Sequence, residues 1–173
     1  MKRLYSVLIA MALLVIFVPA AALAKGASGF PTWSQHLTKG RFTVLPLFHR
    51  DAVFDKETGL VWEKTPDTTT RTWVNALTRC YTQEIGGRKG WRVPTIEELA
   101  SLVDTSQPAP TLPAGHPFIN VQSSNYWSAT TLASNSSGAW DVDFVIGGVH
   151  GGDKSGSHFV WCVRGGQGID GVQ

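Results

Sequence analysis

The chain has 173 residues, with 15 Lys or Arg against 13 Asp or Glu, which gives a formal net charge of +2. Two of the basic residues, Lys2 and Arg3, lie in an N-terminal segment that reads as an export signal, and the rest of the chain carries 13 charges of each sign. This balance argues against nucleic acid or another polyanion as the partner, and the length indicates a single domain.

The N-terminal segment has the three parts of a cleaved secretory signal: a basic start, an apolar run and the small-residue site Ala22-x-Ala24. We expect the mature protein to be secreted or periplasmic and free of the membrane. The alternative is an uncleaved anchor, because the mostly apolar residues 4–24 are numerous enough to span a bilayer. The expected organisation is a signal peptide at 1–24, a flexible leader at 25–40, one domain at 41–166 and a tail at 167–173.

The two cysteines of the chain are Cys80 and Cys162. An exported protein matures in an oxidising compartment, so a disulfide between them is the default expectation. The alternative is a pair of free thiols that take part in chemistry.

Two β-type segments open the predicted domain. Residues 41–47 form an extended run that Pro46 assigns to a sheet edge, because proline has no N–H for a ladder. Residues 52–64 read as a hairpin, in which the Asp55 side chain forms an Asx-turn and Gly59 supplies a positive φ.

A helix that buries one of the cysteines is predicted after a polar loop at residues 66–70. Apolar side chains recur at intervals of three and four residues, which is the spacing of one face of a helix. We expect Thr70 or Thr72 to cap this helix and Gly86–Gly87 to end it. Its buried face is predicted to hold Trp73, Ala76, Leu77, Cys80 and Tyr81.

The segment GRKGWRVPTIEEL combines a basic turn with a helix start. Thr95 and Glu98 have the spacing of a capping box, in which each side chain accepts the backbone N–H of the other residue. We therefore assign Glu98 to a cap rather than to acid–base chemistry, and Arg92 to structural hydrogen bonds. Only Arg88 and Lys89, at the turn, remain to meet a partner. The apolar positions predicted to face the core are Trp91, Val93, Ile96, Leu99, Leu102 and Val103.

The second half of the domain is predicted to alternate loops and strands. Residues 104–122 form a long loop with four prolines, and loops of such length are often functional. Strands are expected at residues 125–131 and 158–165, and polar or glycine-rich loops at 132–138 and 147–157.

The segment AWDVDFVIGG alternates between two faces of a further strand. Asp141 and Asp143 share one face, and two carboxylates placed in this way could share a Ca²⁺ ion. The sequence lacks a D-x-D-x-D-G loop, however, and we interpret the two aspartates as an exposed strand face and assign no metal. The opposite face is predicted to hold Trp140, Val142, Phe144 and Ile146.

Six motifs occur in order along the chain: TGLVW, TW before the first helix, GWRVPTIEEL, YWSAT, AWDVDF and VWCVRGG. Together they resemble the bacterial domain family named after the C-terminal domain of the Legionella collagen-like adhesin, over about residues 41–166. The segment WRVPTIEEL also resembles a signature of formylglycine-generating and sulfatase-modifying enzymes. Both likenesses imply an α+β, C-type-lectin-like fold with two helices, a small twisted, mostly antiparallel sheet and long loops.

The two resemblances imply different functions. The adhesin-type domain implies a surface binding module, reported to recognise sulfated glycans, whereas the enzymes use a late pair of reactive cysteines with copper. Here only Cys162 is late in the chain. We therefore expect a non-catalytic binding or adhesion module for a glycan or a surface protein, without a cofactor. The alternatives are a divergent formylglycine-type oxidase and a structural envelope domain without a ligand.

A rigid scaffold with variable loops commonly places ligand contacts on the loops and turns. The side chains predicted to contact the ligand are Arg88, Lys89, His116, Asn125, Asn135, His150, Asp153 and Lys154.

Overall fold

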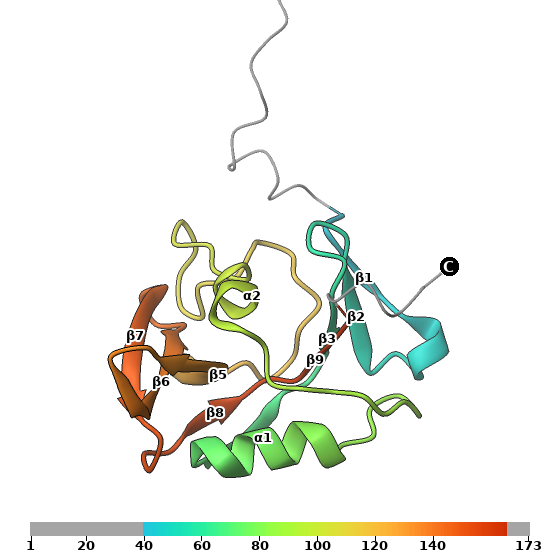
Figure 1. Ribbon diagram of the computed structural model, residues 1–173. Coiled ribbons are helices and arrows are strands. Elements are labelled where there is room, and N and C mark those ends of the chain that lie inside the picture. Colours follow the sequence, from blue (N-terminus) through green and yellow to red (C-terminus); the bar gives the residue numbers. More distant parts are fainter. Residues whose placement is uncertain (1–39, 166–173) are drawn as a thin grey trace, which may run out of the picture. The chain divides into compact units, whose positions relative to one another are not determined.

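The structure of the protein is a computed structural model that describes residues 40–165 (Figure 1). The predicted signal peptide, the leader up to residue 39 and the tail therefore lie outside the described residues. Within residues 40–165, no helix combines the length and the apolar character needed to cross a membrane.

The described chain contains nine strands, two α-helices and one short 3-10 helix. In chain order they are β1 (Phe42–Val44), η3 (Pro46–Phe48), β2 (Ala52–Asp55), β3 (Val61–Glu63), β4 (Asp67–Arg71), α1 (Trp73–Thr82), α2 (Ile96–Ala100), β5 (Asn125–Leu132), β6 (Asn135–Asp143), β7 (Gly148–Asp153), β8 (His158–Val160) and β9 (Val163–Arg164).

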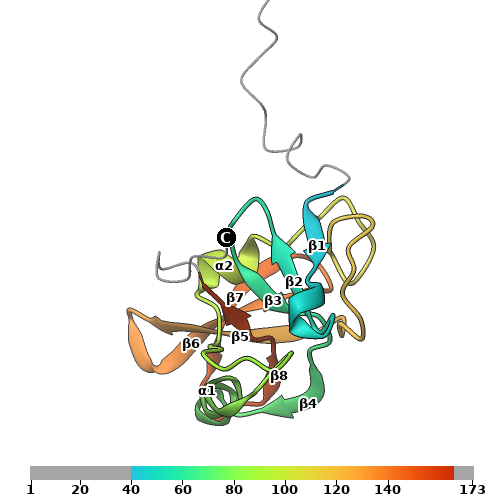
Figure 2. The same cartoon turned by 90° about the vertical axis from the view of Figure 1, so that its right-hand side faces the viewer.

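The strands form two sheets, with the orders β1-β2-β3-β9 and β4-β8-β5-β6-β7. Neighbouring strands run antiparallel, except β5 and β8, which are parallel. Helix α1 packs below β8, where the turned view shows it nearly end-on (Figure 2). The predicted α+β class with two helices is confirmed, although two sheets replace the one expected. The C-type-lectin-like assignment stays a prediction.

The predicted hairpin at the start of the domain is confirmed. It consists of β2 and β3, and Asp55 Oδ1 accepts the backbone N–H of Glu57 at 3.0 Å, as in an Asx-turn. Gly59 has a φ of 72°. This conformation favours glycine, because the Cβ of any other residue would clash with the backbone there. The edge position predicted for residues 41–47 is also confirmed, since β1 is an edge strand of its sheet and stops before Pro46.

The predicted disulfide is confirmed and anchors α1 where the two sheets meet. Cys80 and Cys162 are joined with an S–S distance of 2.10 Å. The strand expected at residues 158–165 is divided into β8 and β9, one in each sheet. It divides because the chain crosses between the sheets there: Trp161 Nε1 donates to the carbonyl of Glu63 at 2.7 Å, and the Glu63 N–H donates to the carbonyl of Cys162 at 3.0 Å.

Tryptophan side chains fill both parts of the core. One cluster surrounds the disulfide with Trp91 and Trp127, and the other contains Trp62 and Trp161, whose rings meet edge to face with centroids 5.7 Å apart. All four side chains are almost completely buried. Burial of such large side chains contributes strongly to stability, so a small domain with short strands acquires a sufficient core.

Two segments predicted as loops are strands. β4 pairs with β8, and β7 pairs with β6 in continuous register over six residues. The first segment is rich in threonine and the second in glycine, so neither shows apolar alternation, and their partner strands supply the hydrogen bonds that sequence reasoning did not foresee. The predicted connection at 132–138 is likewise mostly strand, because β6 begins at Asn135.

Two side chains predicted as buried are exposed. Tyr81 lies at the border of the predicted helix face and is 80% exposed, while Ala76 and Cys80 mark the buried face. Ile146 is 62% exposed because β6 ends at Asp143, so the alternation no longer fixes its direction. Helix α1 also ends at Thr82, before the glycine pair expected to stop it.

Candidate binding site

Three of the predicted ligand residues gather where the β5–β6 and β7–β8 turns meet. The Lys154 N–H donates to the carbonyl of Ser137 at 2.9 Å, which joins the two turns. Lys154 Nζ donates to Thr131 Oγ1 at 2.9 Å and to the Ser136 carbonyl at 2.8 Å, and it lies 4.1 Å from the centre of the Trp73 ring. This ammonium group is therefore held by neighbours of its own chain.

Asn135 and Asp153 stabilise these same turns. Asn135 Oδ1 accepts the N–H and the hydroxyl of Ser137, and Asp153 Oδ1 accepts the N–H and the hydroxyl of Ser155. The bond from the backbone N–H of Ser155 lowers the pKa of Asp153. Both side chains are exposed, but their polar atoms serve local turn geometry first.

Asp141 and Asp143 differ in their environments, and only Asp141 is fully buried. Asp141 is only 1% exposed, and its Oδ1 accepts Asn125 Nδ2 at 2.6 Å. Asp141 lies between Trp127 of β5 and His150 of β7, its partners in the two neighbouring strands, and β7 is a strand where the sequence predicts a loop. Asp143 Oδ1 accepts the backbone N–H of Val145 at 2.7 Å. The exposed face predicted for the two aspartates is wrong for Asp141, and the amide of Asn125 serves this buried carboxylate.

No group of three or more His, Cys, Asp or Glu in the described part of the chain is placed to hold a metal ion.

The two predicted histidines lie in different parts of the chain, one in a loop and one in a strand. His116, in the long loop, stacks on Phe118 with ring centroids 5.8 Å apart, and its Nδ1 accepts the Phe118 N–H at 3.2 Å. Burial lowers the pKa of His116, which favours this neutral, accepting form. His150 is exposed on β7, opposite Asp141 of β6. Contact of the eight predicted residues with a ligand stays a prediction.

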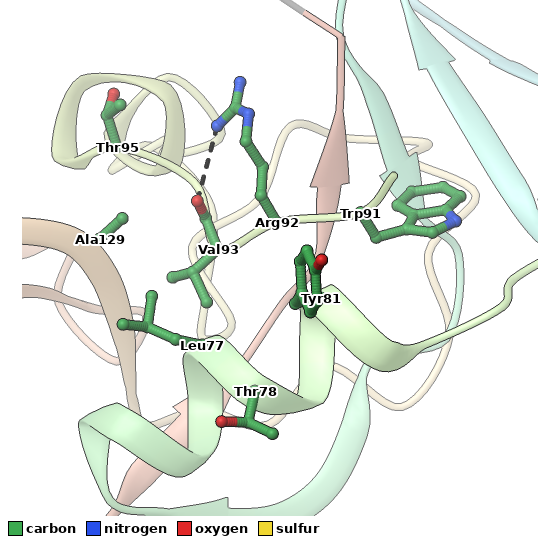
Figure 3. A pocket seen from close by; sticks show the side chains of 8 residues that line it. All are labelled: Leu77, Thr78, Tyr81, Trp91, Arg92, Val93, Thr95 and Ala129. Carbon is green, nitrogen blue, oxygen red and sulfur yellow. Dashed lines mark hydrogen bonds between the residues drawn. The ribbon is translucent and has the colours of Figure 1, made fainter. Parts of the chain in front are cut away.

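A groove that the sequence did not reveal lies between α1 and the segment that crosses it (Figure 3). Its volume is about 650 Å³. Apolar surface dominates the walls, which is the usual character of a ligand site in proteins. The lining side chains are Leu77, Thr78 and Tyr81 of α1, Trp91, Arg92, Val93 and Thr95 of the crossing segment, and Ala129 of β5.

Arg92 fixes the crossing wall of this groove. Its guanidinium forms a bidentate pair with the carboxylate of Glu98, with both N–O distances 2.7 Å, and also donates to the Gly165 carbonyl at 2.7 Å. Its backbone exchanges hydrogen bonds of 2.9 and 2.8 Å with Val163. The structural role predicted for Arg92 is confirmed, and a planar guanidinium with so many acceptors holds the wall rigid.

Glu98 closes the predicted capping box at the start of α2. Its carboxylate accepts the Thr95 N–H at 2.8 Å, and the Thr95 hydroxyl accepts the Glu98 N–H at 3.3 Å. Burial alone would raise the pKa of Glu98, but the hydrogen bonds from Arg92 and Thr95 and the charge of Arg92 lower it overall. Glu98 is thus an ionised anchor, as the capping-box spacing predicts.

The helical wall of the groove presents no charge to solvent. The charged residue of α1, Arg79, turns inward, where its guanidinium binds both carboxylate oxygens of Glu63 at 2.6 and 2.5 Å. Burial raises the pKa of Glu63, and the contacts with Arg79 oppose that shift. A solvent-facing helix surface usually carries charges, so an uncharged one beside a groove is typical of a contact surface. The exposed residues are Val74, Asn75, Thr78, Tyr81 and Thr82.

The basic turn lies next to the groove. Arg88 and Lys89 are exposed, and the Arg88 carbonyl accepts Trp91 Nε1 at 2.8 Å, so the indole that lines the groove also holds the turn. The Arg88 guanidinium lies 5.9 Å from the centre of the Phe48 ring. Within residues 40–165, no carboxylate lies within salt-bridge distance of either side chain. That this turn meets a partner stays a prediction.

Neither cysteine is available as a reactive thiol. Both are bonded in the disulfide, and both are 0% exposed. A buried disulfide lacks the accessible thiolate that nucleophilic or metal chemistry requires. This arrangement counts against the oxidase alternative.

The family model described as "Lcl C-terminal domain" matches residues 51–164, and the resemblance stated from the six motifs is thereby confirmed. No curated protein matches the chain.

Proposed function

Because the chain belongs to the Lcl C-terminal domain family, we propose that it is an exported, non-catalytic adhesion module that binds an anionic glycan in the groove beside α1. Membership in a family named after an adhesin domain and the burial of both cysteines support a binding rather than a catalytic role.

One observation carries the assignment of the ligand to this groove. Tyr81 lines an apolar groove, yet its side chain is 80% exposed. A ligand bound in the groove would therefore cover this ring. A flat aromatic ring offers a stacking surface for the aliphatic face of a sugar, and neighbouring hydroxyls of Thr78 and Thr95 offer hydrogen bonds.

Charge at the neighbouring turn supports an anionic ligand. Arg88 and Lys89 form no ion pair with a described carboxylate, whereas Arg92 is neutralised by Glu98. Sulfate and carboxylate groups are bound by Arg and Lys through charge-assisted hydrogen bonds. An anionic glycan could therefore place its sugar rings in the groove and its acidic groups at the basic turn.

A glycan array with sulfated and desulfated forms of the same polysaccharides tests this function. We expect the sulfated forms to bind, with an affinity that falls as salt is added. Tyr81→Ser should weaken binding roughly tenfold, and Arg88→Gln with Lys89→Gln should remove the preference for sulfated forms. Tyr81→Phe keeps the ring and should bind like the parent protein, and Val74→Ser, outside the lining, is a second control.

Two results would contradict the proposal. If Tyr81→Ser binds as well as the parent, the groove is not the site. If no glycan binds while a surface protein is captured through the same residues, the ligand is a protein and the glycan assignment is wrong.

A further inference from the structure

The four strands at the sheet edges of this protein differ in how they are protected. An edge strand exposes unpaired N–H and C=O groups, and proteins usually protect them by short length, charge, proline or irregular register. The edge strands here are β1 and β9 in the smaller sheet and β4 and β7 in the larger one.

Three of the edges carry such protection. β1 has three residues and is followed closely by Pro46, and β9 has only two residues. β4 has a charged residue at each end, Asp67 and Arg71, and its register with β8 shifts between them. None of these edges offers a long regular row of hydrogen-bonding groups.

β7 lacks these devices. It has six residues in unbroken register with β6, from Gly148 opposite Asp143 to Asp153 opposite Gly138. It contains no proline and no lysine, and its one charge is at its last residue. Figure 1 shows it at the outer end of the larger sheet.

The register fixes which groups of β7 face outward. The hydrogen bond from the Lys154 N–H to the Ser137 carbonyl sets the alternation, so Gly148, His150 and Gly152 bond to β6. Val149 and Gly151 then direct their N–H and C=O groups to the free side. Among residues 40–165, no residue outside the β6–β7 ladder donates to or accepts from these groups.

Apolar side chains lie next to this open edge. Val145, Ile146 and Val149, in and beside the β6–β7 turn, are 47%, 62% and 43% exposed. The Leu132 side chain packs directly on Gly151, where a Cβ would meet Leu132 Cδ1 at 2.9 Å, so it adds a further apolar group beside the edge. An incoming strand would therefore find backbone partners and apolar contact.

We propose that β7 pairs antiparallel with β7 of a second copy of this chain, so that the two larger sheets become one continuous sheet. A two-fold axis at His150 places Val149 of each copy opposite Gly151 of the other, and all outward groups of these residues are then bonded. The Val149 side chain then lies beside the partner's glycine, on the face where Leu132 packs. A foreign strand would need a matching sequence, whereas a second copy supplies this complementarity by symmetry.

Charge does not oppose this pairing. Residues 145–152 contain no Lys, Arg, Asp or Glu, and the chain after the predicted signal carries equal numbers of acidic and basic residues. The paired form would also carry two grooves in one particle, which increases the avidity of an adhesion module for a repetitive ligand.

Sedimentation velocity of the purified exported protein over a wide range of concentrations tests the proposal. We expect a monomer–dimer equilibrium. Val149→Pro removes an outward N–H without breaking a bond to β6 and should weaken the dimer at least about tenfold. Val149→Lys keeps the N–H but adds a charge to the edge and should have the same effect, and Val149→Thr, which keeps both features, should leave the dimer intact.

Near-ultraviolet circular dichroism shows whether each variant is folded. If Val149→Pro is unfolded, the dimerisation of Val149→Lys tests the proposal instead. A parent protein that is monomeric at every concentration would overturn the proposal. So would a dimer that persists in both the Pro and the Lys variants, because it would use another interface. Tyr81→Ser should leave the dimer unchanged, which separates this test from that of the groove.

Discussion

Helix α1 and Thr95, the N-cap of helix α2, both line one groove, but the two helices are held in different ways. At the start of α2, the Glu98 carboxylate accepts hydrogen bonds from the Thr95 N–H and from the Arg92 guanidinium. α1 has no side-chain bond at its N-cap, Thr72, and is fixed instead by a disulfide and by the inward pair of Arg79 with Glu63. Because these contacts lie on the buried side of α1, its solvent-facing side remains available for a ligand.

The largest expected effect is on α1. Replacing Cys80 and Cys162 together by alanine removes the covalent anchor, and we expect the free energy of unfolding to fall by roughly 2–5 kcal/mol. Urea unfolding followed by tryptophan fluorescence measures this change. The reduced parent protein is the matched control, because it keeps both sulfur atoms. A loss below about 1 kcal/mol would show that packing alone holds α1.

The next effect is on α2. Glu98→Ala removes the cap of Thr95 and leaves Arg92 without its carboxylate, so we expect a loss of roughly 1–3 kcal/mol. The neighbouring Glu97 is exposed, and Glu97→Ala should change stability by no more than about 0.5 kcal/mol. Equal losses in the two variants, measured by the same urea titration, would contradict the role given to Glu98.

Acid should weaken the anchor of α2 but not the disulfide of α1. The pKa of Glu98 is lowered from its ordinary value of 4.5, so its contribution is complete above that value and is lost as the pH falls through the lower, folded-state pKa. The stability difference between the parent protein and Glu98→Ala should therefore shrink below about pH 4.5. Unfolding titrations at neutral and acid pH measure this difference. A gap that stays constant into strong acid would mean that Glu98 acts through packing rather than charge.

Sequence reasoning was most accurate where a local rule determined the structure. The capping box of α2, the Asx-turn at Asp55 and the positive φ of Gly59 depend on side chains a few residues apart, and each is present. The disulfide was predictable because a chain with two cysteines has only one intramolecular pairing, and the predicted export signal favours oxidation. The structural role of Arg92 followed from its place beside a helix start.

Features that depend on a distant partner were missed. β4 and β7 carry no apolar alternation, and they are strands only because β8 and β6 offer them a ladder. Asp141 is opposite His150 of β7, and Val149 lies at the free edge of the same strand. Because β7 was predicted as a loop, the sequence showed neither the buried position of Asp141 nor this sheet edge. The groove was missed for the same reason, since Tyr81, Val93 and Ala129 come from three separate elements.

The sequence by itself determined the family, the α+β class, the disulfide pairing and the start of α2, because these depend on composition, compartment and short-range hydrogen bonding. Tertiary structure alone decided that Arg79 turns inward, that Tyr81 remains exposed beside an apolar groove and that β7 ends its sheet unprotected. These are properties of surfaces assembled from distant segments, where packing partners rather than local propensity set the direction of each side chain.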